Sequence, residues 1–167
     1  KGVVTSLDIN IRLRASIDTK AYLEGVRSLL PLADIVKASD EDLEPFEFGA
    51  DPQRAAARAY EEMESGMLVL TEGGGGATLY TARGRLEKAS YPVANIIDTV
   101  GAGDTVHSAF LASLYRADAI RRPYREIDTD VLGDAVDFAC AAAAINVSRA
   151  GCSPPTQEEV ESYRRSV

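Results

Sequence analysis

The sequence predicts an α/β fold with a largely parallel sheet. Short apolar runs of strand length alternate with longer stretches that open on polar capping residues and end at glycine or proline. This alternation is typical of βαβ units, whose helices cover the faces of a parallel sheet. Because no internal repeat, low-complexity tract or linker divides the 167 residues, we expect one domain, or part of one, with a sizeable core.

Six runs predict strands: residues 3–9, 33–37, 67–71, 77–82, 85–91 and 93–97. The runs at 33–37, 67–71 and 93–97 are mainly apolar, as buried strands are. The runs at 77–82 and 85–91 alternate around Gly84, which is typical of a hairpin. The chain begins with lysine, directly before the first expected strand, so a segment upstream is expected.

Six helices are expected: residues 18–30, a short acidic one opening at 39–42, 52–64, 98–115, 130–147 and a last one opening at 156–159. Asp18 and Thr19 can cap the first helix, and Pro31 ends it. Pro52 suits the first turn of the third helix, and Gly66 suits its C-terminal end.

The second half of the chain carries a long helix that we expect to be buried. Residues 130–147 are apolar nearly all round from Ala139 to Ile145, which is typical of a helix inside the core. Residues 156–159 form a capping-box pattern that opens the last amphipathic helix. The polar, arginine-rich stretch at 117–128 predicts a surface loop.

Composition limits the partners and the location. The formal net charge of −8 argues against nucleic acid or an anionic membrane as the main partner. The sequence shows no basic-plus-apolar leader and no apolar run of membrane-spanning length. Cys140 and Cys152 fit reduced thiols, so a cytoplasmic location is expected. With one histidine and two cysteines, a His/Cys zinc site is excluded.

The stretch Asp-Thr-Val-Gly-Ala-Gly-Asp-Thr at 98–105 lies between an expected strand and an expected helix. The first N–H groups of a helix lack internal partners and carry partial positive charge, so they suit an anion. Gly101 and Gly103 allow the backbone to approach a ligand closely. Asp104 adds negative charge there, which suggests a base for the group that attacks a phosphate. The alternative is a tight turn in which Asp104 is only a helix-start carboxylate.

The same eight residues resemble the C-terminal signature of the PfkB (ribokinase-like) carbohydrate kinases. Residues 70–77 resemble that family's V-T-x-G-x-x-G-A stretch, and residues 141–151 resemble its final alanine-rich helix and Arg-x-Gly ending. Residues 8–12 match the D-x-N-x-R of the fructokinase and 2-keto-3-deoxygluconate kinase branches. The resemblance implies a ribokinase-like fold, present here as its C-terminal, nucleotide-binding half, without the sugar-binding half and lid.

The resemblance also implies a reaction: transfer of the γ-phosphoryl group of ATP, with Mg²⁺, to a hydroxyl of a fructose- or 2-keto-3-deoxygluconate-like sugar. Its site residues would be Asp104 as base and sugar contact; Gly101, Ala102 and Gly103 as anion hole; Thr71, Gly73, Gly76, Cys140 and Ala143 for the nucleotide; Asn10 and Arg12 for the sugar; Asp42 for Mg²⁺; and Asp98 for a monovalent cation such as K⁺. A homodimer is the assembly considered for the full-length protein, and this chain alone is expected to be inactive.

A purely structural role is the alternative for several of these residues. The four glycines at 73–76 can form a plain hairpin turn, Arg12 can be a surface arginine, and Asp98 can cap its loop. His107 lies one helical turn after Asp104. A buried histidine with its own hydrogen-bond partners is favoured there over a histidine that lines the active-site cleft.

Two positions depart from the family pattern. Asp42 stands where ribokinase has a longer glutamate, and Cys140 stands where many members have asparagine.

Three other functions remain as alternatives: a ribokinase or nucleoside kinase, a regulator that binds nucleotide or sugar without catalysis, and a Rossmann-type NAD(P) protein. The last fits poorly, because neither glycine cluster has the G-x-G-x-x-G spacing. No lysine follows the glycines, so a Walker A loop is excluded as well.

Overall fold

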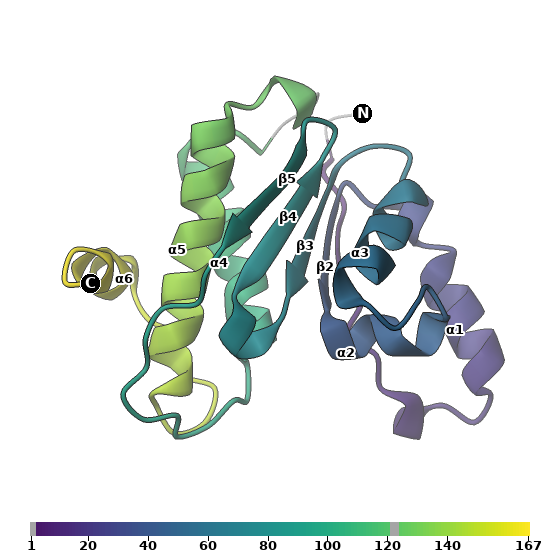
Figure 1. Cartoon of the computed structure of the whole chain (residues 1–167), viewed down its shortest axis with the longest axis horizontal. Coiled ribbons are helices and arrows are strands. Elements are labelled where there is room, and N and C mark those ends of the chain that lie inside the picture. The colour runs from purple at the N-terminus through teal and green to yellow at the C-terminus, as the bar shows by residue number, and fades with distance from the viewer. Residues whose placement is uncertain (1–2, 121–123) are drawn as a thin grey trace.

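The computed structural model describes residues 3–120 and 124–167, in which a five-stranded sheet separates two groups of helices (Figure 1). The strands lie in the order β1-β2-β3-β4-β5. They are β1 (Ser6–Asp8), β2 (Ile35–Ser39), β3 (Met67–Thr71), β4 (Ala77–Thr81) and β5 (Gly84–Lys88). The first three are parallel, and β4 and β5 are antiparallel to their neighbours. The predicted α/β class is confirmed, with a sheet that is parallel only in its first part.

The helices cover both faces of this sheet. They are α1 (Thr19–Arg27), α2 (Asp40–Leu43), α3 (Pro52–Glu61), α4 (Ala102–Arg116), α5 (Thr129–Val147) and α6 (Gln157–Arg164). Figure 1 shows α1, α2 and α3 on one face and α4 and α5 on the other, with α6 outside α5. None of the helices in the described ranges is long and apolar enough to span a bilayer.

Each face of the sheet has its own core. On one face Ile35, Met67 and Val69 belong to the same buried cluster as Phe110 of α4. On the other face Val36, Leu68 and Leu70 pack with Ala55, Ala56 and Ala59 of α3. Successive residues of a strand point to opposite faces, and both faces of β2 and β3 are covered. Their nearly unbroken apolar runs follow from this.

Most expected elements are present with shifted ends. β3 and the hairpin of β4 and β5 are confirmed, and the capping boxes of α2 and α6 are formed. α1 ends at Arg27 rather than at 30, because a 3₁₀ turn, Leu30–Leu32, contains Pro31 and cannot continue the α-helix. α3 ends at Glu61, three residues before the expected end at 64, and β1 keeps only three residues of the expected 3–9.

Two expectations were wrong. Residues 93–97 form no strand, and Ile96 and Ile97 are 67% and 61% exposed. Instead, the Ile97 N–H donates to the Val147 carbonyl at 2.8 Å, which ties the segment to the end of α5.

The stretch 117–128 is not wholly a surface loop, because Ala119, Tyr124 and Ile127 are buried in the core of α4 and α5. The polar residues around these three apolar side chains hid their contribution to the core. Residues 121–123 of the expected loop lie outside the described part of the chain.

Candidate active site

The N-terminus of α4 differs from those of its neighbours. Side chains cap the other five α-helices through Asp18, Ser39, Asp51, Asp128 and Thr156. Gly101 occupies the cap position of α4 with φ 77°, and no side chain accepts from the first turn among the described residues. The Ala102 N–H donates to the Thr99 carbonyl at 3.2 Å. The N–H groups of Gly103 and Asp104 are therefore the ones in this turn that suit an external anion. Asp104 is exposed on the same turn.

The loop before α4 is held rigidly by the segment that follows α5. Asp98 accepts from the Val100 N–H at 2.9 Å and from the Gly151 N–H at 3.0 Å. Asn146, fully buried, donates to the Val100 carbonyl and accepts from the Ser153 N–H, both at 3.0 Å. The signature loop is thereby fixed before any ligand arrives, as a preorganised anion site requires.

Gly101 is required at its position for two reasons. Its positive φ disfavours any side chain, and a Cβ there would lie 2.3 Å from Cys152 Sγ. The close approach of Cys152 to the loop was not visible in the sequence, because the two residues are far apart in the chain.

A buried ionic cluster lies beside this turn, where β1 and β2 end. Lys37 of β2 is 5% exposed, and its Nζ lies 3.3 Å from Asp8 Oδ1 and 3.7 Å from Asp42 Oδ2. A Cβ on Gly103 would come within 2.7 Å of the same Nζ, so the ammonium lies directly against the first turn of α4. Lys37 was not predicted as a site residue, because a lysine at the end of an apolar run is commonly exposed to solvent. The apolar residues on both sides of it were the sequence feature that could have indicated burial.

His107 joins the cluster from α4. Its Nε2 lies 2.6 Å from Ser6 Oγ, and its Nδ1 lies 3.8 Å from Asp8 Oδ2. Burial lowers the pKa of His107, with Lys37 acting in the same direction and the carboxylates of Asp8 and Asp104 opposing. The ring therefore has polar partners on β1, as expected of a satisfied histidine, and it faces the ionic cluster rather than an apolar core.

Asp42 holds local structure with both of its oxygens. Oδ1 accepts from the Ile11 N–H at 2.8 Å, and Oδ2 accepts from the Ser39 N–H at 2.9 Å. Mg²⁺ takes oxygen ligands in near-ideal octahedral geometry, whereas this carboxylate is 5% exposed and already engaged. The described residues contain no group of three His, Cys, Asp or Glu side chains placed to hold a metal ion. Asp42 therefore does not fit direct magnesium coordination.

The D-x-N-x-R loop follows β1 at the same edge of the sheet. Asn10 has φ 41° and, like Arg12, is exposed. The Arg12 guanidinium donates to the Ile11 carbonyl at 2.9 Å, and the Asp42 contact with Ile11 anchors the loop to α2. Both side chains can be reached by a ligand.

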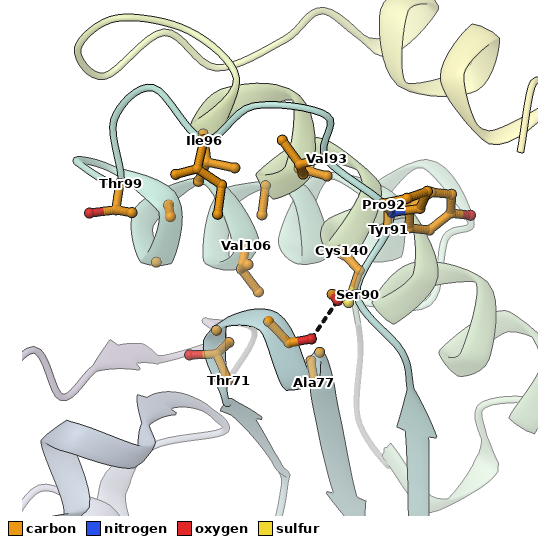
Figure 2. A pocket seen from close by; sticks show the side chains of 18 residues that line it. Thr71, Ala77, Ser90, Tyr91, Pro92, Val93, Ile96, Thr99, Val106 and Cys140 are labelled. Carbon is orange, nitrogen blue, oxygen red and sulfur yellow. Dashed lines mark hydrogen bonds between the residues drawn. The ribbon is translucent and has the colours of Figure 1, made fainter.

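A cavity of about 440 Å³ opens between the end of the sheet and helices α4 and α5. Figure 2 shows Thr71 and Ala77 facing Val106 and Cys140 across it. The cavity brings together Thr71, Gly73, Gly76, Ala102, Gly103, Cys140 and Ala143 of the predicted site. Asn10, Arg12, Asp42, Asp98, Gly101 and Asp104 are not among the described residues that line it. Its walls are mostly apolar, which suits a flat, weakly polar ring.

The glycine run forms a turn between two strands and also lines the cavity. Residues 73–75 form a 3₁₀ turn between the antiparallel strands β3 and β4, so the run is a hairpin connection. Gly73, Gly74 and Gly76 also line the cavity, and Ser90 Oγ donates to the Gly74 carbonyl at 2.6 Å (Figure 2). Opposite them, burial raises the pKa of the Cys140 thiol to about 11, so Cys140 contributes a neutral, compact wall.

Known proteins resemble this chain over nearly its whole length. Residues 3–159 match the profile of the pfkB family carbohydrate kinases. The chain is 30% identical to the protein named "Probable fructokinase-5" of Arabidopsis thaliana, over 99% of this chain and 50% of the relative. It is 34% identical to the fructokinase of Rhizobium leguminosarum bv. trifolii, over 80% of this chain and 41% of the relative.

The fold has solved counterparts as well. The crystal structure of fructokinase from Vibrio cholerae O395, in a form with bound fructose, ADP and calcium ion, superposes with a TM-score of 0.81. That comparison has 24% identity and covers 95% of this chain and 49% of the other. The chain thus spans about half the length of the first curated relative it matches.

Proposed function

Because the chain belongs to the pfkB family of carbohydrate kinases, we propose that it is the nucleotide-binding part of a sugar kinase. The reaction would transfer the γ-phosphoryl group of ATP to a hydroxyl of a small sugar. One observation carries the proposal: an apolar cavity adjoins the uncapped N-terminus of α4, and Asp104 is exposed on that same turn.

The cavity suits the base of the nucleotide. Cys140, Ala143 and Val106 supply apolar surface for a ring, while Thr71 and Gly73 lie at the end of β3 where the phosphates would pass. Ala102 and Gly103 line the cavity and also begin α4. A nucleotide held in this direction would present its terminal phosphate to the free N–H groups of the helix.

The first turn of α4 would then stabilise the transferred group. Negative charge in the transition state spreads over the equatorial oxygens of the phosphoryl group. The loop that leads into this turn is held in advance by the Asp98 and Asn146 contacts. The N–H groups of Gly101, Gly103 and Asp104 would therefore need no rearrangement to meet that charge. Asp104, exposed beside them, would accept the proton of the attacking hydroxyl.

The acceptor is proposed to be fructose or a 2-keto-3-deoxy sugar acid. The fructokinase relatives and the exposed Asn10 and Arg12 support this choice. A guanidinium can bind a carboxylate or phosphate through two hydrogen bonds. Ribose and nucleosides are the competing acceptors.

The metal requirement follows from the substrate. Magnesium would come with the nucleotide, held by phosphate oxygens and water, since Asp42 does not fit as a direct ligand. Asp98 remains the candidate for a monovalent cation such as K⁺, although both of its oxygens accept backbone N–H groups. A cytoplasmic location and a homodimer of the full-length protein also remain proposals.

The test is ADP release by the full-length protein with ATP and a panel of fructose, 2-keto-3-deoxygluconate, ribose and a nucleoside. We expect turnover with one of the first two. Asp104→Asn should lower kcat about 10³-fold, because a positioned base contributes about 10²–10⁴, and should leave the Kd for ATP nearly unchanged.

Asp130→Asn is the matched control, since Asp130 is an exposed aspartate in the first turn of α5. Near-normal turnover by Asp104→Asn would contradict the assignment of the base. Nucleotide binding without turnover on any acceptor would favour a regulator.

A further inference from the structure

We propose that Lys37 is a positioning residue of this site, whose buried ammonium holds the first turn of α4 and sets a fixed positive charge beside the transferred phosphoryl group. The inference rests on the proposed function and goes beyond it, because neither the anion hole nor the base requires a lysine on β2.

The surroundings of Lys37 indicate a built arrangement. Lysine is almost never fully buried unless it is paired, and Lys37 is 5% exposed in the second strand of the sheet. Its Nζ lies 3.3 Å from Asp8 Oδ1 and 3.7 Å from Asp42 Oδ2. Asp8 is also its register partner across the β1–β2 ladder. The ammonium is therefore held from two sides at the edge where the sheet meets α4.

The contact with Gly103 joins this charge to the anion hole. A Cβ at Gly103 would lie 2.7 Å from Nζ, and the side chain of Lys37 already fills that space. Gly103 is the second residue of α4 and lines the nucleotide cavity. Lys37 thus acts through Gly103: it sets how closely the first turn of α4 approaches β2, and it adds charge at short range.

The charge balance around the turn makes this cation important. Asp8 and Asp42 face Lys37, and Asp104 carries a further carboxylate on α4. ATP brings additional negative charge to the same place. In a poorly hydrated site a single ammonium acts more strongly than it would in water. A phosphoryl group that gains charge during transfer would be stabilised by it.

A purely structural role is the competing explanation. Lys37 could serve only to neutralise Asp8 and Asp42 so that the sheet edge is stable. Removal of one partner from a buried ion pair is strongly destabilising in either case. A loss of stability on mutation therefore does not distinguish the two explanations, whereas discrimination between ATP and ADP does.

The experiment uses the full-length protein with three substitutions: Lys37→Met, the double variant Lys37→Met/Asp8→Asn, and Lys20→Met as an exposed lysine control on α1. Calorimetric titration gives the Kd for ATP and for ADP, and thermal unfolding gives Tm. The ratio of the two Kd values is the readout that a structural role would leave unchanged.

We expect Lys37→Met to weaken ATP binding about tenfold more than ADP binding, as expected for a charge close to the γ-phosphate. Its Tm should fall. The double variant should recover Tm, because one carboxylate is neutralised, and should keep the altered ATP-to-ADP ratio. Lys20→Met should match the unmodified protein in all three measurements.

The inference is overturned if Lys37→Met changes both affinities equally or neither, or if the double variant restores the ratio together with Tm. Because nucleotide binding is measured without an acceptor, failure of the protein to phosphorylate any sugar would contradict the proposed function and leave the Lys37 result decisive. An unmodified protein that binds neither nucleotide would overturn both.

Discussion

His107 carries a titratable ring that is largely buried between α4 and β1. Its neighbours on the sheet are Ser6 and Asp8 of β1 and Lys37 of β2. Asp104 lies one turn earlier on α4. Burial is the largest cause that lowers its pKa below the ordinary 6.5. The folded protein therefore favours the neutral ring, whose nitrogen next to Ser6 can share a hydrogen bond with the hydroxyl.

This shift predicts a pH dependence with a definite sign. As pH falls below about 6.5, the unfolded chain takes up a proton at residue 107 before the folded protein does, so the free energy of unfolding decreases. His107→Gln keeps a hydrogen-bonding partner for Ser6 and removes the titration. Between pH 7 and pH 5.5 the variant should lose less stability than the unmodified protein, as measured by urea unfolding at each pH.

The comparison uses the difference between the two pH curves, so that effects common to both proteins cancel. Lys20→Gln, a change at an exposed lysine of α1, controls for surface charge. Parallel curves for His107→Gln and the unmodified protein would contradict the lowered pKa.

Single residues of the site differ in how well the sequence predicts them. Residues 98–105 carry a local pattern, so the helix start, its glycines and its acid could be identified without a structure. Lys37 and Cys152 could not, because their importance comes from contacts with Gly103 and Gly101, far away in the chain. Such proximity is a property of the packed molecule.

At the scale of elements, α5 serves the site as a brace. Its Asn146 is 0% exposed and binds the Val100 carbonyl and the Ser153 N–H. Its last residue, Val147, accepts from the Ile97 N–H. The helix thereby fixes both the segment that leads into the signature loop and the segment that follows it.

Asn146→Ala should therefore damage the site as well as the fold. The substitution leaves one carbonyl and one N–H without their partner in a part-buried place, and each lost hydrogen bond contributes about 0.5–1.5 kcal/mol. We expect a lower free energy of unfolding and weaker ATP binding, because the signature loop loses its support. Urea unfolding and calorimetric titration of the full-length protein measure the two effects.

Ser148→Ala is the matched control, since Ser148 is exposed at the end of α5 and its hydroxyl donates to the nearby Ile145 carbonyl. Normal ATP affinity in a destabilised Asn146→Ala protein would show that the loop keeps its shape without this contact.

The elements predicted well were those whose start and end are marked by residues next to them in the sequence. β3 has an apolar run bounded by glycines on both sides, and α6 has a capping box that the structure forms. Residues 93–97 have the composition of a strand but find no partner in the sheet, so hydrogen bonds to the end of α5 replace a ladder. Strand formation depends on a neighbour, which composition alone cannot supply.

For the whole molecule, the alternation of strands and helices was enough to predict the class. The pairing changes from parallel to antiparallel between β3 and β4, at the glycine connection, and the predicted hairpin at Gly84 adds the second antiparallel pair. The order of the strands is the simplest one possible, with each pairing its neighbours in sequence. The chain spans about half of the first curated relative, and we propose that most sugar contacts lie outside these 167 residues.

A polypeptide of these 167 residues alone should therefore still bind nucleotide. It should phosphorylate fructose poorly or not at all. Within the described ranges β1 pairs only with β2, so its outer edge presents unpaired backbone groups, which favour association between copies. ADP release with fructose, compared with the full-length protein, measures the first expectation, and sedimentation at rising concentration measures the second. Fructose phosphorylation at the affinity of the full-length protein would contradict the assignment of the sugar contacts, while a monomer at all concentrations would show that the β1 edge is protected in another way.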